Sequence, residues 1–594
     1  MLEYSVKKRV WKVDERPDPT LVKNIAESLK ILEPTAALIV SKGFDTPEKA
    51  YGFLKNHSID FGDPYELPDM RAAVKRIREA LEKREKIVVF GDYDVDGVTS
   101  TTILYDYLKI NSADVSYYIP NRMAEGYGVN RAALKRLADE GKTLMITVDN
   151  GTTAVEQINE AKSFGLDTVV TDHHECREVL PDCPVVNPKR PDCAFGFREL
   201  AGVGVTFMLI VALEAELRMT TLENARKFAM RRFCELVAIG TVADVMPLVG
   251  VNRDIVYYGL RLMRETKNPG LRALMIASGV AETDENGENF HPKSTLTATS
   301  VAFTIAPRIN AAGRLDDAKI AVELFLTEDN RRAWEIASKL CQMNSARQTE
   351  EDAIVTAALS EVEKQCRPTD RVIVIAGEGW HGGVIGIVSS RVTEKFGLPS
   401  IIVTFPDDSE ASVGKGSGRS VHGFNLVKSL EECAGTLEGF GGHEMAAGLT
   451  VRRDRLEDFR RAINDSVARQ FGDGWIEQVV RADYELRPSE ITLEQAKQLR
   501  LLEPMGTGNP TPVFYTKNLT LSDKRTTTGG RHTQLRFSSP ERSEPISAIW
   551  FGKTADSITQ EIGERVEILY TLEANSFNGR ERAQIRPYDI RSAK

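Results

Sequence analysis

Apolar residues recur at helical spacing over residues 21–32 and 70–81. This spacing predicts that residues 1–80 form a helical N-terminal region. Beyond that region the pattern changes, because short runs rich in β-branched residues, such as 87–90, alternate with amphipathic stretches. Such alternation is typical of a parallel sheet covered by helices, so we expect residues 81–325 to form one α/β domain.

A long polar segment with regularly spaced apolar residues follows. Residues 328–365 contain no glycine or proline, and we expect one connecting helix over 326–366. A second α/β pattern covers 367–473, with a helix predicted from Gly383 to Glu394. The β-rich runs on either side of that helix are 371–376 and 400–405.

The C-terminal segment, residues 474–594, carries many short β-rich runs separated by glycine turns. This pattern predicts a small β-barrel, in which Asn578-Gly579 joins the last two strands. The expected strands are 513–521, 533–537, 546–551, 566–572 and 583–585. The chain is therefore predicted to be a multidomain α/β protein with a C-terminal barrel.

Composition narrows the class of protein. With 594 residues, 42% of them hydrophobic and 27% charged, the chain is predicted to be globular with several domains. No segment has the apolar length of a membrane span, and the N-terminal residues lack the apolar core of a secretory signal. Seven cysteines without a Cys-x-x-Cys pair favour reduced thiols and a cytoplasmic location. The net charge of −9 argues mildly against nucleic-acid binding, although cations bound at an acidic site would offset part of it.

Three β-rich runs of the first α/β domain end in side chains that bind metals. Because the carboxyl ends of parallel strands meet at one edge of an open sheet, these side chains are expected to converge. Clustered carboxylates combined with imidazole suit a pair of Mn²⁺ or Mg²⁺ ions. The side chains, in chain order, are Asp92, Asp94, Asp96, Asp149, Asp172, His173 and His174.

Asp94 and Asp96 are two residues apart, and we expect them to lie in a loop from which both reach the metal pair. The Asp-x-Asp-x-Asp-Gly pattern also begins EF-hand calcium loops. Here the twelfth position of such a loop is Ile103 rather than an acid, which argues against calcium binding.

These motifs, in this order and followed by Val242-Ala243-Asp244, resemble the DHH phosphoesterase superfamily, and the resemblance covers nearly all of the chain. Within the superfamily the chain looks like the exonucleases specific for single-stranded DNA. The resemblance implies 5′ to 3′ hydrolysis of phosphodiester bonds with two divalent cations, Mn²⁺ or Mg²⁺, in DNA recombination and repair. It also implies work beside a single-strand-binding protein and a RecQ-type helicase.

The resemblance also assigns roles to the metal-binding side chains. One cation is held by Asp94 and Asp149, and the other by Asp96, Asp149, His173 and Asp244. The remaining catalytic groups are Asp92 and His174, the latter as a hydrogen-bond donor to the scissile phosphate.

Two of these assignments have alternatives. Asp244 follows a stretch of helical pattern, so it is either a ligand or a buried capping acid. The superfamily often has a metal-binding His four residues before Asp94, where this chain has Phe90. The first cation is therefore expected to recruit Asp92 or water.

Four glycine-rich or small-residue segments resemble the DHHA1 substrate-binding domain and its surroundings. We expect loops at 306–315, 416–420 and 439–443, and a helix N-terminus after 379–386 that receives a phosphate. The alternative is tight turns without a ligand and, for the helical arginine, a solvated side chain. By resemblance, the substrate-binding residues are Arg308, Asn310, Arg314, His381, Arg391, Ser417, Arg419, Gly441, Gly442 and His443.

The C-terminal barrel resembles an oligonucleotide-binding (OB) domain. Tyr515, Phe537 and Trp550 are candidates to stack on bases, although an aromatic residue in a small barrel more often belongs to the core. Basic residues of the barrel are expected to contact phosphates. They are Lys524, Arg525, Arg531 and Arg536.

Two other functions stay open. One is a DHH-family phosphodiesterase of short oligonucleotides or cyclic dinucleotides, although such enzymes are usually shorter and the terminal barrel would have no role. The other is a non-catalytic scaffold that binds single-stranded DNA, as in relatives that have lost metal ligands.

Overall fold

The structure is a computed structural model that describes residues 10–55, 59–121, 128–284, 290–293, 296–315, 318–367, 369–406, 412–471, 479–527, 529–577 and 580–593. The chain divides into two compact units. Unit 1 is built mainly from Lys339–Val480, with the short segment Ala311–Asp317. Unit 2 contains Trp11–Asn310, Ala318–Ser338 and Arg481–Lys594.

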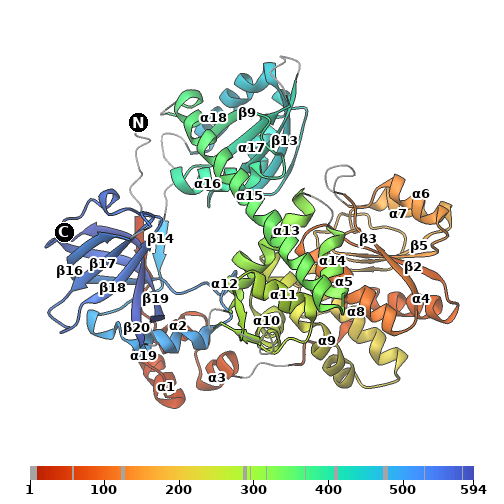
Figure 1. Cartoon of the computed structure of the whole chain (residues 1–594), viewed down its shortest axis with the longest axis horizontal. Coiled ribbons are helices and arrows are strands. Elements are labelled where there is room, and N and C mark those ends of the chain that lie inside the picture. The colour runs from red at the N-terminus through yellow and green to blue at the C-terminus, as the bar shows by residue number, and fades with distance from the viewer. Residues whose placement is uncertain are drawn as a thin grey trace. The chain divides into compact units, whose positions relative to one another are not determined.

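Unit 2 contains a five-stranded parallel sheet with the order β3-β2-β4-β5-β6. Strands β2, β3 and β5 of this sheet are labelled in Figure 1. The central strand β4 is buried along its whole length, as expected for a strand covered on both faces. The strand order reverses between β2 and β4, which makes this the topological switch point where open α/β sheets bind ligands. The strands are β2 (Lys86–Phe90), β3 (Asp114–Tyr118), β4 (Leu144–Val148), β5 (Asp167–Thr171) and β6 (Val185–Val186).

Helices cover this sheet and form the rest of the α/β core. Leu134 and Leu137 of α6 pack against Val88 and Met145 of the sheet. Helix α8 is apolar over most of its length and buried from Gly202 to Glu214, so it is a central rather than a surface helix. The helices are α4 (Met70–Glu82), α5 (Val95–Ile110), α6 (Arg131–Asp139), α7 (Val155–Ala161), α8 (Gly202–Leu217), α9 (Leu222–Ala243), α10 (Gly250–Met263), α11 (Pro269–Ala277) and α14 (Lys319–Leu326). A short hairpin, β7 (Ala281–Thr283) with β8 (Phe290–Pro292), follows α11.

The N-terminal region is helical, as predicted, and its helices share a hydrophobic core with the C-terminal barrel. The amide of Leu32 donates to Gln498, and Gln495 donates to the Thr35 hydroxyl at 2.9 Å. The two ends of the chain therefore fold together. The elements are β1 (Val10–Val13), α1 (Pro19–Leu29), α2 (Glu33–Ser41) and α3 (Pro47–Lys55) at one end and β14 (Val479–Ala482) and α19 (Leu493–Gln498) at the other.

The C-terminal strands form a six-stranded sheet that closes into a barrel through pairing of β16 with β19. Phe537 is fully buried in its core, which excludes it from base stacking, whereas Trp550 is only partly buried. The Lys524 ammonium donates to the carbonyls of Ile558 and Gln560, and therefore anchors a loop. The strands are β15 (Tyr484–Glu485), β16 (Phe514–Thr526), β17 (His532–Ser538), β18 (Ile546–Phe551), β19 (Arg565–Phe577) and β20 (Arg580–Ser592).

Unit 1 is a second α/β fold, as predicted. Its five-stranded sheet has the order β12-β13-β11-β10-β9, in which β9 and β10 are parallel and the other pairs antiparallel. The long helix α15 (Asn330–Gln365) is continuous and packs its last turns on this sheet through residues such as Ile354 and Val362. The other elements are β9 (Ile373–Glu378), α16 (Ile385–Phe396), β10 (Ser400–Phe405), β11 (Val413–Arg419), α17 (Leu426–Glu432), β12 (Gly439–Gly442), β13 (Ala446–Arg452) and α18 (Leu456–Phe471).

Three predicted loops are wrong. Residues 306–315 form helix α13 (Ala306–Leu315), which continues directly from the π-helical turn Val301–Ile305 and is favoured by its alanines. The segment 416–420 lies largely in β11, which is hydrogen-bonded on both sides, and 439–442 forms the edge strand β12. Low strand propensity of glycine is overridden in both by pairing with β13.

Some predictions lie outside the described residues. These are the turn at Asn578-Gly579, the domain boundary between residues 473 and 474, and the character of residues 1–9. Within the described residues, no helix combines the length and the apolar character that crossing a bilayer requires.

Candidate metal centre and strand-binding groups

The β2–α5 turn brings the first acids to the switch point. Asp94 caps α5, and its carboxylate accepts a hydrogen bond from the Gly97 amide at 3.0 Å. Asp96 lies in the first turn of the helix, so the predicted loop ends at Asp94. Gly97 is required here, because a Cβ would lie 2.5 Å from the Asp92 carbonyl oxygen.

Asp96 is fixed by the N-terminus of α8. Its two carboxylate oxygens accept hydrogen bonds from the amides of Gly202 and Val203 at 2.7 and 2.8 Å. A side chain at Gly202 would lie 2.6 Å from a carboxylate oxygen of Asp149. The sequence interpretation missed this helix N-terminus, whose only signal is the small-residue run before an apolar helix.

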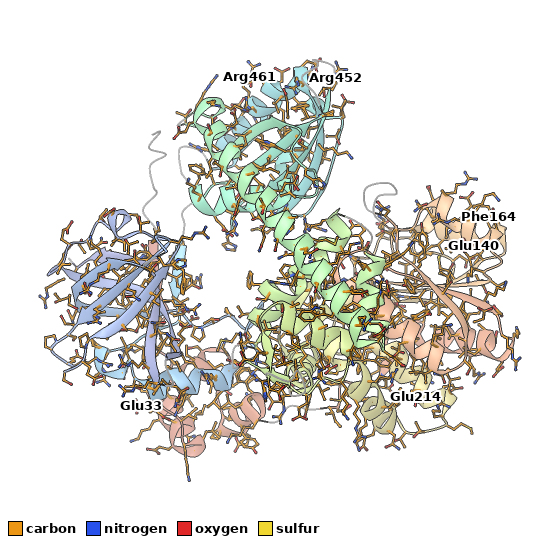
Figure 2. The ribbon with its side chains drawn as sticks, in the orientation of Figure 1. Glu33, Glu140, Phe164, Glu214, Arg452 and Arg461 are labelled. Carbon is orange, nitrogen blue, oxygen red and sulfur yellow. The ribbon has the colours of Figure 1, made fainter. Side chains whose placement is uncertain are left out.

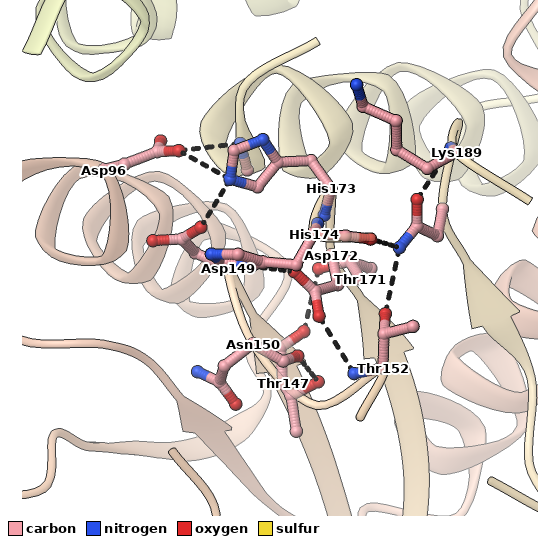
Figure 3. Close-up of polar contacts among 12 residues, drawn as sticks. Asp96, Thr147, Asp149, Asn150, Thr152, Thr171, Asp172, His173, His174 and Lys189 are labelled. Carbon is pink, nitrogen blue, oxygen red and sulfur yellow. Dashed lines mark hydrogen bonds and ion pairs between the residues drawn. The ribbon is translucent and has the colours of Figure 1, made fainter. Parts of the chain in front are cut away.

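Asp149 and His173 approach each other at the ends of β4 and β5. Asp149 has a left-handed backbone, with φ +62°, which points its side chain back over the sheet edge. The Nε2 atom of His173 lies 3.2 Å from Asp149, 3.8 Å from Asp96 and 3.5 Å from Asp244. Figure 3 shows Asp96, Asp149 and His173 turned toward one another.

Asp244 is the C-cap of α9, so the alternative interpretation as a capping residue describes its backbone correctly. Its side chain keeps 28% of its surface exposed and reaches His173. The backbone therefore ends the helix while the carboxylate joins the acidic cluster.

His174 lies in a separate hydrogen-bonded network. Its Nδ1 atom lies 2.7 Å from Asp172, which also accepts from the amides of Thr152 and His173. Buried Asn187 donates to the Thr152 hydroxyl and to the His174 carbonyl. Thr152 and Asn187 were not predicted, because neither side chain is a typical metal ligand and Asn187 lies 13 residues beyond His174.

Burial and mutual repulsion perturb the acids of the cluster. Burial, reinforced by Asp244 and Asp94, raises the pKa of Asp96 well above its usual range. Burial and then the charge of Asp96 do the same to the pKa of Asp149. Burial and Asp94 raise the pKa of Asp244 to about 7. The cluster therefore holds more carboxylates than it can keep ionised without added positive charge.

The two histidines are perturbed in opposite directions. Burial lowers the pKa of His173 to about 4, so this imidazole is neutral at pH 7 and is available as a ligand. Burial also acts to lower the pKa of His174, but the hydrogen bond and charge of Asp172 outweigh it and raise this pKa to about 9. The same interaction, against the effect of burial, holds the pKa of Asp172 well below its usual range.

These residues fit a pair of divalent cations. The Nε2 atom of His173 and one carboxylate oxygen of Asp149 are buried and have no hydrogen-bond partner in the part of the chain that the structure describes, and metal coordination would supply one. Among the described residues, three groups of side chains could each hold a cation, because the potential ligand atoms within each group lie within 4.8 Å of one another. They are Asp92–Asp94–Asp149, Asp96–His173–Asp244 and Asp149–His173–His174. The first group includes Asp92, one of the two alternatives, with water, for the ligand that Phe90 cannot supply.

The predicted strand-binding residues of unit 1 are mostly engaged with neighbouring protein groups. Arg314 donates to the Gly383 carbonyl at 2.6 Å, and His381 accepts from the Gly383 amide at 3.1 Å. Arg419 donates to Ser417 at 3.2 Å and to the Gly418 carbonyl at 2.8 Å, and burial lowers its pKa. The contact of Arg314 with Gly383 brings together the end of α13 and the residues before α16. The contacts of Arg419 stay within β11.

Other predicted residues lie apart. Arg391, on α16, pairs with Glu351 of α15 at 3.3 Å. Gly441, Gly442 and His443 are exposed at the end of the edge strand, where a Cβ on Gly442 would lie 2.5 Å from the Ala446 carbonyl. Arg308 and Asn310 lie on the part of α13 that belongs to unit 2.

Other arginines of unit 1 belong to surface ion pairs. Figure 2 shows Arg452 and Arg461 at its outer surface, where they pair with Asp454 and Asp458 at 2.8 and 2.7 Å. An arginine in this unit is therefore not by itself a sign of DNA binding.

Family models match three parts of the chain. The model described as the DHH family, N-terminal domain, matches residues 86–241, the DHHA1 domain matches 369–469, and the RecJ OB domain matches 482–589. The Bacillus subtilis protein named single-stranded-DNA-specific exonuclease RecJ is 38% identical over 578 residues, which cover 97% of this chain and 70% of that protein.

Solved structures agree with this result. The crystal structure of Thermus thermophilus RecJ in complex with Mn²⁺ matches with a TM-score of 0.81 and 28% identity, covering 98% of this chain and 80% of that one. The corresponding Mg²⁺ complex matches with a TM-score of 0.75 and 27% identity, covering 98% of this chain and 79% of that one.

Proposed function

Because the chain belongs to the RecJ family of single-stranded-DNA-specific exonucleases, we propose that it removes nucleotides from the 5′ end of single-stranded DNA with two divalent cations. The observation that carries the proposal is the set of overlapping ligand groups at the switch point. Asp149 and His173 each belong to two of these three groups, and each has a buried atom for which the described ranges offer no hydrogen-bond partner.

We assign one cation, Mn²⁺ or Mg²⁺, to Asp92, Asp94 and Asp149, and the other to Asp96, Asp149, His173 and Asp244. When bound, such a pair supplies a water of lowered pKa and neutralises charge that develops at the phosphorus. Asp96 is fixed by two amides of α8, so it offers a carboxylate with little freedom to move. This rigidity supports ligation.

His174 is assigned to the scissile phosphate. With its pKa raised to about 9, it is protonated at neutral pH and donates a hydrogen bond to an anionic oxygen. Asp172 and Asn187 hold the imidazole ring and its backbone in place.

The strand itself is assigned to groups on α13 and in the DHHA1 domain. Exposure of the glycine-bearing end of β12 and of Arg391 supports a role in gripping phosphates. The proposed residues are Arg308, Asn310, Arg314, His381, Arg391, Ser417, Arg419, Gly441, Gly442 and His443. The proposed domains are 1–80, 81–325, 326–366, 367–473 and 474–594.

The test uses a single-stranded oligonucleotide labelled at its 5′ end in one sample and at its 3′ end in another. With Mn²⁺, we expect mononucleotide label from the 5′-labelled strand at once, and progressively shortened fragments from the 3′-labelled strand. Early release of the 3′ label would reject the polarity. Absence of any product with both Mn²⁺ and Mg²⁺ would favour the scaffold, although every assigned ligand is present.

A phosphodiesterase of short oligonucleotides is the alternative. The match of residues 482–589 to the RecJ OB domain supports a longer substrate instead. Turnover of a dinucleotide as fast as that of a long strand would reverse this choice.

The setting of the activity is also proposed. We assign the protein to DNA recombination and repair in the cytoplasm, beside a single-strand-binding protein and a RecQ-type helicase. Seven cysteines, none paired in a disulfide in the described residues, support a reducing compartment. Pull-down with each partner tests the contacts.

A further inference from the structure

Helix α9 ends in a turn that normally contains glycine. The amide of Val245 donates to the Val242 carbonyl at 3.2 Å, and the amide of Met246 donates to the Thr241 carbonyl at 3.3 Å. With Asp244 as C-cap, these two bonds define a Schellman motif whose C′ residue is Val245.

Val245 has a φ of +59°, in the left-handed region. Glycine is the usual residue at C′ because it lacks a Cβ, and asparagine is the usual substitute. A β-branched side chain is a clear outlier there, because its Cβ and methyl groups crowd the backbone. The sequence therefore keeps a residue that the turn itself disfavours.

Packing does not explain the valine. Its side chain is 67% exposed, so the strain is not offset by burial in the core. Its chain neighbour Asp244 reaches the Nε2 atom of His173 at 3.5 Å. Consecutive Cα atoms are about 3.8 Å apart, so this exposed apolar group lies at the rim of the metal centre. Strained residues are found preferentially at such sites.

We propose that Val245 is a substrate-contacting residue, whose methyl groups pack against the sugar and base of the nucleotide at the scissile linkage. A valine offers no polar group, so it recognises the carbon surface of the nucleotide rather than its phosphate. Such a contact is independent of base identity. The inference rests on the proposed exonuclease function, because it takes single-stranded DNA as the ligand.

A matched control lies at the C-terminal end of α8, the end away from Asp96. Met219 is also the C′ residue of a Schellman motif, with bonds from Met219 to Glu216 and from Thr220 to Ala215. Its φ is +47° and its side chain is 94% exposed. Because the first residue of α8, Gly202, contacts Asp96 and the helix has 16 residues, Met219 lies about 24 Å from the centre.

The experiment compares Val245→Gly, Val245→Asn, Val245→Leu and Met219→Gly in the full chain. It measures the thermal midpoint, Mn²⁺ affinity by calorimetry, and kcat and KM on a 5′-phosphorylated single strand. Glycine and asparagine both suit the turn, so we expect an unchanged or raised midpoint and unchanged Mn²⁺ affinity for both. Their KM rises about 4- to 15-fold, corresponding to one or two buried methyl groups.

The remaining variants separate contact from structure. Val245→Leu keeps KM within about twofold of the wild type, because leucine keeps the apolar contact although it suits the left-handed turn less well than glycine. Met219→Gly keeps KM unchanged. If the wild type is active and both Val245→Gly and Val245→Asn keep KM within twofold of the wild-type value, the inference is wrong but the proposed function stands. A parallel loss of Mn²⁺ affinity would also overturn the inference, because it would make Val245 a support for Asp244. An inactive wild type would refute the proposed function and the inference with it.

Discussion

The acidic centre of unit 2 and the arginines of unit 1 differ in how their charges are balanced by neighbouring groups. Asp96, Asp149 and Asp244 are crowded together with raised pKa values and a neutral imidazole. Arg391 and Arg419 instead already contact a carboxylate or a carbonyl. The acidic centre is therefore incomplete without cations, whereas the arginines are stable as they are. In the proposed function they would bind a strand by exchanging or adding contacts.

The largest expected effect comes from removing the acid that belongs to two ligand groups. Asp149→Ala should lower exonuclease activity by about 10³-fold or more, because both proposed cations lose a ligand. Asp182→Ala is the control, since its side chain is 86% exposed and forms a surface ion pair with Lys162. Rates of nucleotide release with Mn²⁺ measure the difference. Activity within tenfold of the wild type in Asp149→Ala would separate this centre from catalysis.

The convergence of the acidic side chains and His173 at one edge of the sheet could be predicted from sequence, because its signals are local. β-branched runs set the strands, and their carboxyl ends meet by topology, so acids in the next few residues converge. Gly202 and Val203 contact Asp96 across about a hundred residues, which no local pattern reveals. The same reason hides the shared core of the N-terminal helices and the barrel.

Unit 1 was harder to predict because glycine carries little information on strands. β11 reads Val-Gly-Lys-Gly-Ser-Gly-Arg, typical of a loop, yet it pairs on both sides. Its glycines allow close packing, since a Cβ on Gly416 would lie 2.6 Å from Leu449. Tertiary pairing, not propensity, decides this strand.

In unit 1, the buried partner of the arginines should matter for stability. Glu351 accepts from Arg347 at 3.2 Å and lies 3.3 Å from Arg391, and both Glu351 and Arg347 are buried. Glu351→Ala leaves Arg347 with Asn344 alone and should destabilise unit 1 by about 3 kcal/mol. Denaturant unfolding of the variant checks this, with Mn²⁺ affinity as the readout that should stay constant. A loss under 1 kcal/mol would show that the pair is not a structural element.

Glu235 is a buried acid outside the metal centre, so its pKa shows the effect of burial without repulsion from other carboxylates. Burial raises the pKa of Glu235 to about 7, and its hydrogen-bond partner is Thr266. For an acid with a raised folded pKa, stability falls as pH rises from the unfolded value, about 4.5, through 7. The loss is at most about 3 kcal/mol at pH 8, and Glu235→Gln should remove it. Unfolding free energies at pH 5 and 8 for both proteins give the answer, and equal pH slopes would contradict the assignment.

Cations should stabilise unit 2 and leave unit 1 unchanged. At a free concentration 100 times its Kd, Mn²⁺ should add about 2.7 kcal/mol to the stability of unit 2. Calorimetric scans with Mn²⁺ or EDTA measure the shift, and Asp149→Ala should reduce it. A shift of equal size in the transition of unit 1 would mean that the ions bind elsewhere as well.

The smallest effect on stability is expected at Arg391, where the two roles of an arginine can be separated. Its side chain is 61% exposed, so losing its pair with Glu351 should cost less than about 1 kcal/mol. Arg347 still satisfies the buried Glu351. If Arg391 grips a phosphate, Arg391→Ala should raise KM for single-stranded DNA and flatten the dependence of binding on salt by about one counterion. Arg461→Ala, which removes another exposed ion pair of unit 1, is the matched control. Equal salt slopes for the two variants would mean that Arg391 forms an ion pair but binds no phosphate. The contrast would then be between a metal centre that requires cations and a second unit whose arginines require no bound strand.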